Sequence, residues 1–207
     1  MRALASAPVA IYTRKGDDGT TGLLFGGRVG KDSPPIALNG AVDEAQASLG
    51  SARAEAEPGS ELDELLSGLE GDLYVLMAEV ATAPENRRKL VAGTTLVSAE
   101  MVTALERRID ELMARFEMPT AFVIPGQNRL SAALDVARTV VRRAERLVGS
   151  VDLDGSQVGR YLNRLSDLVW VLARWQEGDA HLLARGSGVR SGRGSRCGDD
   201  RGSAAPA

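Results

Sequence analysis

The sequence has little cysteine, histidine and aromatic content, and the first two shortages exclude particular site types. Its one cysteine, Cys197, cannot form an intramolecular disulfide, which favours a reducing compartment, the cytoplasm. Its one histidine, His181, excludes a two-histidine metal site and disfavours a serine–histidine triad. We expect both to be incidental surface residues. Any chemistry must then use carboxylates, arginines, lysines and backbone amides.

Charge and hydropathy disfavour two classes of partner. Lysine and arginine number 25 against 28 aspartates and glutamates, a net charge of −3. This chain therefore lacks the basic excess of a general binder of nucleic acids or anionic membranes. No run approaches the roughly 20 apolar residues of a membrane-spanning helix, and the chain does not start with the charged-then-apolar pattern of a secretory signal. We expect neither nucleic acid nor membrane as a partner.

The apolar residues predict an all-α fold. Aromatics make up only 4% of the 207 residues, and alanine, leucine and valine supply most of the apolar content, which favours helices. Apolar residues recur at alternating spacings of four and three, typical of packed amphipathic helices. Five such stripes span residues 38–52, 62–80, 102–116, 130–148 and 158–172. Ser60 and Ser98 are expected N-caps. The prediction is a five-helix up-and-down bundle.

Three segments differ in composition and define the expected domain organisation. Residues 1–10 are small and apolar without periodicity, and we expect a flexible N-terminus. Residues 11–180 form the expected single domain. Residues 181–207 are dominated by glycine, serine and arginine, so we expect a disordered tail.

A glycine-rich arm precedes the first helix. Its residues 11–35 contain too many glycines for a helix. Glycines can turn successive backbone N–H groups into one concavity, where threonines and a lysine would complete an anion cradle. The arm is not a Walker A loop, because Gly26 to Asp32 has three residues between its glycines and ends in an aspartate. A flexible arm and a phosphate cradle are both compatible with this composition.

The fourth helix carries an unusual concentration of arginine. Arg138, Arg142 and Arg146 recur every four residues and share one face. Crowded like charges need neutralisation, either by a phosphate-bearing ligand or by carboxylates of neighbouring helices. Spacing alone slightly favours the carboxylates.

Three further residues admit two interpretations each. Asn163 on the fifth helix could read a ribose or a base edge, or make a helix–helix contact. Asp43 follows the apolar Val42 and would need a cation if it were buried. Phe122, on a proline-stiffened link, could contact a ligand or plug the core.

Together these segments resemble the PduO-type ATP:corrinoid adenosyltransferases, from Ile11 to about Arg174. Four stretches carry the resemblance in order: IYTRKGDDGTTGLLFGGRVGKD, GAVDEAQASLG, FVIPG followed by LSAALDVARTVVRRAER, and YLNRLSD. The resemblance implies a cobalamin adenosyltransferase-like helical bundle with a nucleotide loop, assembled as a homotrimer with sites between subunits. The implied reaction transfers the 5′-deoxyadenosyl group of ATP to the cobalt of cob(I)alamin, giving adenosylcobalamin and triphosphate.

The resemblance also implies roles for individual residues. Asp43 would pair with Arg138 across the subunit interface, Phe122 would press on the lower face of the corrin, and Arg142 would face the triphosphate. The implied ATP-binding residues are Thr13, Arg14, Lys15, Gly16, Thr21, Gly22, Lys31, Arg142, Arg143, Glu145, Arg146 and Asn163. Mg²⁺ would accompany the triphosphate without a protein metal site. Implied protein partners are a reductase and an enzyme that uses adenosylcobalamin.

Some positions depart from the family pattern. Gln46 replaces an asparagine, Asp135 stands where histidine is frequent, and Trp170 stands where phenylalanine is frequent. Gln127 and Asn128 also differ from the common residues, and Lys15 is larger than the usual occupant. Gln46, Asp135 and Trp170 leave a second hypothesis open, a non-catalytic sensor or carrier that binds ATP and adenosylcobalamin.

Overall fold

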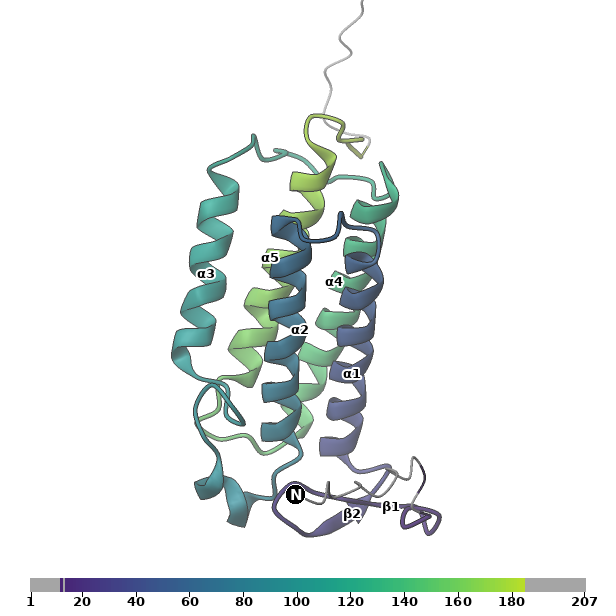
Figure 1. Ribbon diagram of the computed structural model, residues 1–207, viewed down its shortest axis with the longest axis vertical. Helices are drawn as coiled ribbons and strands as arrows, with labels where there is room; N and C mark the ends of the chain where they lie inside the picture. The colour runs from purple at the N-terminus through teal and green to yellow at the C-terminus, as the bar shows by residue number, and fades with distance from the viewer. Residues whose placement is uncertain (1–11, 13, 185–207) are drawn as a thin grey trace, which may run out of the picture.

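The computed structural model describes residue 12 and residues 14–184, and its core is a bundle of five α-helices (Figure 1). The helices are α1 (Pro34–Arg53), α2 (Glu61–Val80), α3 (Ala99–Met113), α4 (Arg129–Leu147) and α5 (Val158–Glu177). Successive helices run in opposite directions, which confirms the predicted up-and-down bundle. Helix α4 packs against α1 and α5, while α3 packs against α5.

The predicted apolar stripes form the core. Leu66, Leu73 and Leu76 on α2 are fully buried, and α5 is buried on most of its circumference. Both expected N-caps are present, because Ser60 Oγ accepts from the Asp63 N–H and Ser98 Oγ accepts from the Met101 N–H.

One predicted stripe extends too far. The apolar spacing predicts Phe116 within the third helix, but α3 ends at Met113. The chain there enters a tighter turn in which the Arg115 N–H donates to the Leu112 carbonyl at 2.9 Å. Phe116 still packs against the core from the loop.

The glycine-rich arm is not helical, as expected, and folds into a small hairpin. Strand β1 (Thr20–Gly22) pairs antiparallel with β2 (Arg28–Gly30). Gly26 and Gly27 make the connecting turn with φ of +101° and +94°, which side chains rarely adopt. The tip docks on the end of α2, where the Leu24 N–H donates to the Ala81 carbonyl at 2.8 Å.

The hairpin lies at the end of the bundle where α1 begins, and the link that carries Phe122 lies at the opposite end (Figure 1). Two short 3₁₀ helices, η1 (Pro84–Lys89) and η2 (Val148–Ser150), occupy connections at the hairpin end. The expected flexible N-terminus, Thr13, Cys197 and most of the expected tail lie outside the described residues. Among the helices that the structure describes, none has the length and apolar content to span a membrane.

A polar pair joins α2 to α5 inside this bundle. The hydroxyl of Tyr161 donates a hydrogen bond of 2.8 Å to Asp72 Oδ2. Burial raises the pKa of Asp72 above its ordinary value, against the opposing effect of the Tyr161 hydrogen bond. Burial likewise raises the pKa of Tyr161, which the negative charge of Asp72 raises further. Folding therefore makes Asp72 easier to protonate than it is in the unfolded chain.

This shift gives a test by pH. The stabilising effect of the raised Asp72 pKa is present below the unfolded pKa and is lost as pH rises through the folded pKa. Asp72→Asn removes the titration but keeps an oxygen acceptor for Tyr161. The variant should gain stability relative to the wild type as pH rises above about 4, the ordinary pKa of an aspartate, because only the wild type loses the effect of the raised pKa. Urea unfolding measures this, with the exposed Asp152→Asn as control. A difference that does not vary with pH would contradict the assignment.

Candidate functional site

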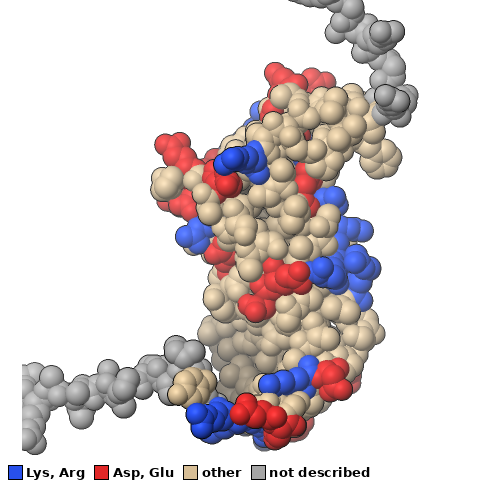
Figure 2. All heavy atoms as spheres, turned by 90° about the vertical axis from the view of Figure 1, so that its right-hand side faces the viewer, with Lys and Arg blue, Asp and Glu red and all other residues tan. Residues whose placement is uncertain are grey.

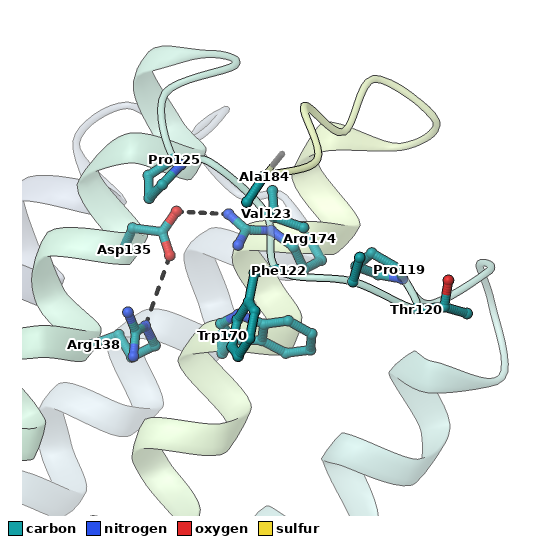
Figure 3. Close-up of a pocket in the computed structure, with 11 residues that line it drawn as sticks. Pro119, Thr120, Phe122, Val123, Pro125, Asp135, Arg138, Trp170, Arg174 and Ala184 are labelled. Atoms are coloured by element: carbon teal, nitrogen blue, oxygen red, sulfur yellow. Dashed lines mark hydrogen bonds and ion pairs between the residues drawn. The ribbon is translucent and has the colours of Figure 1, made fainter. Parts of the chain in front are cut away.

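A cavity of about 700 Å³ opens between the α3–α4 link, α4 and α5 (Figure 3). Link residues 119–123 and Pro125 form one wall, and Asp135 and Arg138 of α4 form another. Trp170 and Arg174 of α5 complete it, together with Ala184 after the last helix. Phe122 projects into this space, and 89% of its side chain is exposed. Phe122 therefore does not plug the core of this chain, which removes one of its two interpretations.

The wall of this cavity contains a buried group of charges. The Arg174 guanidinium, 1% exposed, donates to Asp135 Oδ2 at 2.6 Å and to Glu177 Oε1 at 3.0 Å. His181 Nδ1 lies 3.1 Å from Glu177 Oε2. Arg138 Nε lies 3.7 Å from Asp135 Oδ1. Figure 3 shows Asp135 between the two arginines.

Sequence reasoning identified only part of this group. It assigned no role to Arg174 and did not single out Glu177. The expectation that His181 is an incidental surface residue is wrong, because its side chain is 13% exposed and contacts the buried Glu177. A usable signal was Asp135, a carboxylate that directly follows the buried Leu134 in an apolar stripe.

Trp170 lies between the cavity and a second hollow. Its ring lines the cavity and lies 5.7 Å from the Arg174 guanidinium carbon, a cation–π contact. Trp170 also borders a neighbouring hollow between α3 and α5 that includes Asp167 and Arg164. Burial raises the pKa of Asp167, which Arg164 partly offsets.

The arginines farther along α4, Arg142, Arg143 and Arg146, are exposed. Lysine and arginine side chains gather at mid-height of the molecular face in Figure 2. Arg143 forms an ion pair with Glu44 of α1. Within the described residues, no carboxylate lies within ion-pair distance of the Arg142 or Arg146 guanidinium. A carboxylate of a neighbouring helix therefore neutralises the charge of Arg143. The charges of Arg142 and Arg146 have no such partner among the described residues and could meet an anionic ligand.

Asn163 and Glu145 meet beside these arginines. Asn163 Nδ2 donates to Glu145 Oε1 at 2.8 Å, joining α5 to α4. Of its two interpretations, the helix–helix contact is therefore present in this chain. Asp43 is exposed on α1, so the case in which it is buried without a cation does not arise within one subunit.

The hairpin arm forms a second polar group. A Cβ on Gly16 would lie 3.1 Å from Lys31 Nζ, so this glycine allows the ammonium to approach the backbone. Arg28 Nε donates to Thr20 Oγ1 at 2.9 Å. Hydrogen bonds from Thr20, followed by the nearby Arg28 charge, lower the pKa of Asp18. Sequence reasoning did not single out Arg28 as a site residue.

The remaining predicted arm residues lie in the same region but contribute differently. Arg14 adopts a positive φ of 61°, an uncommon conformation for this residue type. Arg14, Lys15 and Gly22 are exposed, and Thr21 is half-buried. Within the described residues, no hydrogen bond or ion pair joins the arm to the arginines of α4. One chain therefore presents the arm and the arginine face as separate parts.

The chain matches the family model described as cobalamin adenosyltransferase over residues 11–176. It is 38% identical to the corrinoid adenosyltransferase of Mycobacterium bovis over 87% of this chain and 95% of that protein. It is 39% identical to the corrinoid adenosyltransferase PduO of Salmonella typhimurium over 84% of this chain. It spans about half the length of that second relative, 51%.

Solved structures agree with these sequence matches. A variant of the PduO-type ATP:corrinoid adenosyltransferase from Lactobacillus reuteri, complexed with cobalamin and ATP, superimposes with a TM-score of 0.74. The two share 27% sequence identity, and the match covers 86% of this chain and all of that chain. Another variant of the same enzyme, complexed with ATP, superimposes with a TM-score of 0.72.

The buried charges of the cavity wall give a stability test. Arg174→Met leaves Asp135 and Glu177 without their shared cation, so we expect a loss of about 3–5 kcal/mol in the free energy of unfolding. Arg164→Met on the same helix removes an exposed pair with Glu106 and should cost less than about 1 kcal/mol. Denaturant unfolding of both variants measures the difference. Equal losses would show that Arg174 does not neutralise the cavity wall.

Proposed function

The chain belongs to the cobalamin adenosyltransferase family, and from this premise we propose that it transfers the 5′-deoxyadenosyl group of ATP to the cobalt of cob(I)alamin. The products are adenosylcobalamin and triphosphate. The observation that carries the proposal is the pairing, along one helix, of an apolar-walled cavity with a face of exposed arginines. Arg138 lines the cavity, and Arg142 follows about 6 Å farther along α4.

This reaction demands little chemistry from the protein. Co(I) attacks the 5′ carbon of ATP, the carbon–oxygen bond breaks, and the whole triphosphate leaves with the bonding electrons. Co(I) supplies the electron pair, so no protein nucleophile or general base is needed. The protein must orient the 5′ carbon, neutralise the leaving group and exclude water. Arginines without carboxylate partners suit the second task, because their planar forks match phosphate oxygens.

We assign ATP to the hairpin arm and the lower half of α4 and α5. Lys31 and Arg142 face the phosphates, and Asn163 and Glu145 meet the nucleoside. The other proposed contacts are Thr13, Arg14, Lys15, Gly16, Thr21, Gly22, Arg143 and Arg146. Mg²⁺ accompanies the triphosphate, held by phosphate oxygens and water.

The assembly we propose is a homotrimer whose sites lie between subunits. Support comes from the separation of the arm from the arginine face within one chain. Asp43 is exposed, and in a trimer it would pair with Arg138 of a neighbouring subunit. That contact would compete with the 3.7 Å contact of Arg138 to Asp135 in its own chain. Val136, 60% exposed on α4, would be covered by the neighbour.

The corrin occupies the cavity under Phe122. An exposed aromatic ring at the rim can press on the lower face of the corrin and displace the axial base. The resulting four-coordinate Co(II) is easier to reduce to Co(I). A reductase would supply the electron, an adenosylcobalamin-dependent enzyme would take the product, and the cytoplasm is the proposed compartment.

The direct test is anaerobic conversion of cob(I)alamin with Mg-ATP, followed optically, with triphosphate assayed alongside. We expect adenosylcobalamin and triphosphate in equal amounts. Binding of ATP without conversion would instead support the sensor or carrier. That alternative draws on Asp135, which is engaged with Arg174 in the cavity wall, and on Gln46, whose Nε2 donates to the Glu70 carbonyl. Absence of both binding and conversion would contradict each function.

A single-residue test addresses the arginine face. Arg142→Ala should lower kcat by about 100-fold or more, because the departing triphosphate loses a charged partner in the transition state. We expect the oligomeric mass to stay unchanged. Arg160→Ala, also exposed but on α5, is the control and should keep wild-type turnover. Wild-type kcat in the Arg142 variant would remove this residue from the site.

A further inference from the structure

The chain beyond α5 returns to the link that carries Phe122. The Ile124 N–H donates to the Leu182 carbonyl at 2.7 Å, and the Ala184 N–H donates to the Phe122 carbonyl at 2.7 Å. Val123 and Leu183 form an isolated antiparallel bridge between these bonds. Residues 182–184 therefore act as a short strand against residues 122–124, beyond the predicted start of the tail at residue 181.

Backbone and side-chain hydrogen bonds fix residues 178–181, which connect α5 to this strand. Gly178 ends α5 with φ of +55°, a conformation that favours glycine, and the Ala180 N–H donates to the Glu177 carbonyl at 3.1 Å. His181 then lies with Nδ1 3.1 Å from Glu177 Oε2. A carboxylate can only accept, so the ring donates from Nδ1. This hydrogen bond fixes the residue immediately before the pairing strand.

Glu177 is itself held by the cavity wall. Its side chain is fully buried, and Arg174 Nε lies 3.0 Å from the same oxygen that His181 contacts. Arg174 in turn holds Asp135 of α4 at 2.6 Å. A continuous set of polar contacts thus runs from α4 through α5 to the strand that pairs with the Phe122 link.

We propose that His181 and Glu177 are positioning residues that hold Phe122 over the corrinoid cavity through the strand at residues 182–184. The inference rests on the proposed function, because it assigns the cavity to the corrinoid. Phe122 is 89% exposed and has little packing to fix its ring. Its place therefore depends on the backbone, and the two hydrogen bonds flanking Val123 set that backbone. Ala184 also lines the cavity, so the same strand forms part of its wall.

The test compares variants of the full chain. His181→Ala removes the contact to Glu177, His181→Asn restores a donor near the position of Nδ1, and the exposed Asp179→Ala is the matched control. Ala184→Pro removes the N–H that donates to the Phe122 carbonyl, so it loosens the link at residues 122–124 without changing His181. Four readouts are measured for each variant: hydrogen exchange of the peptide covering residues 119–127, the spectrum of four-coordinate Co(II) with ATP bound, the dissociation constant of cobalamin, and the dissociation constant of ATP.

We expect His181→Ala and Ala184→Pro to speed exchange in residues 119–127 and to reduce the four-coordinate Co(II) signal. Cobalamin binding should weaken about tenfold, the scale of one charge-assisted hydrogen bond. ATP affinity should stay unchanged, and His181→Asn should restore most of the signal.

Faster exchange with an unchanged Co(II) spectrum would overturn the positioning role, since the strand would then be structural only. Unchanged exchange in both variants would overturn it as well. A wild type that binds no cobalamin would overturn the proposed function and this role together. A wild type that converts cobalamin while His181→Ala matches it would overturn only the role of His181 and Glu177.

Discussion

The architecture of the cavity depends on one buried cation. The Arg174 guanidinium lies in the interior between a carboxylate of α4 and a carboxylate of its own helix. A buried charge without partners is strongly unfavourable. Arg174, Asp135 and Glu177 must therefore keep their relative positions in the folded chain. Because Asp135 is on α4 and Glu177 ends α5, this requirement also fixes how the two helices pack at the end of the bundle that carries the Phe122 link.

Helix α4 separates two kinds of chemistry along its length. Near its start, Asp135 and Arg138 border the open cavity, whose walls are mostly apolar. Two turns farther on, the side chains are exposed and basic, and Asn163 and Glu145 connect them to α5. Helix α4 thus presents a cavity and a basic face at a fixed spacing, and the proposed function assigns the corrinoid to the first and the triphosphate to the second. The family to which the chain belongs acts on a substrate pair of this description.

The features that were predicted correctly from the sequence depend on residues close to one another along the chain. The apolar spacing within 62–80 and the serine caps at Ser60 and Ser98 depend on neighbours within one or two helical turns, and all appear in the structure. The buried contacts of Asp135, Glu177 and His181 depend on which helices meet, which spacing within one helix does not reveal. The same reason explains why the pairing of residues 122–124 with residues 182–184 was not predicted, since some 60 positions separate the two segments. The roles of Phe122, Arg142 and the arm residues come from family resemblance and remain proposals.

The two tryptophans of the chain, Trp170 and Trp175, both lie on the last helix near the open end of the bundle. Trp170 lines the cavity, and the Trp175 ring lies 5.9 Å from the Arg115 guanidinium carbon at the end of α3. No other part of the sequence contains tryptophan, so the ultraviolet fluorescence of this residue type originates entirely from this region. A coloured ligand seated in the cavity would accept excitation energy from Trp170, because this ring lines the cavity. The native chain thus contains an optical probe of cavity occupancy without any added label.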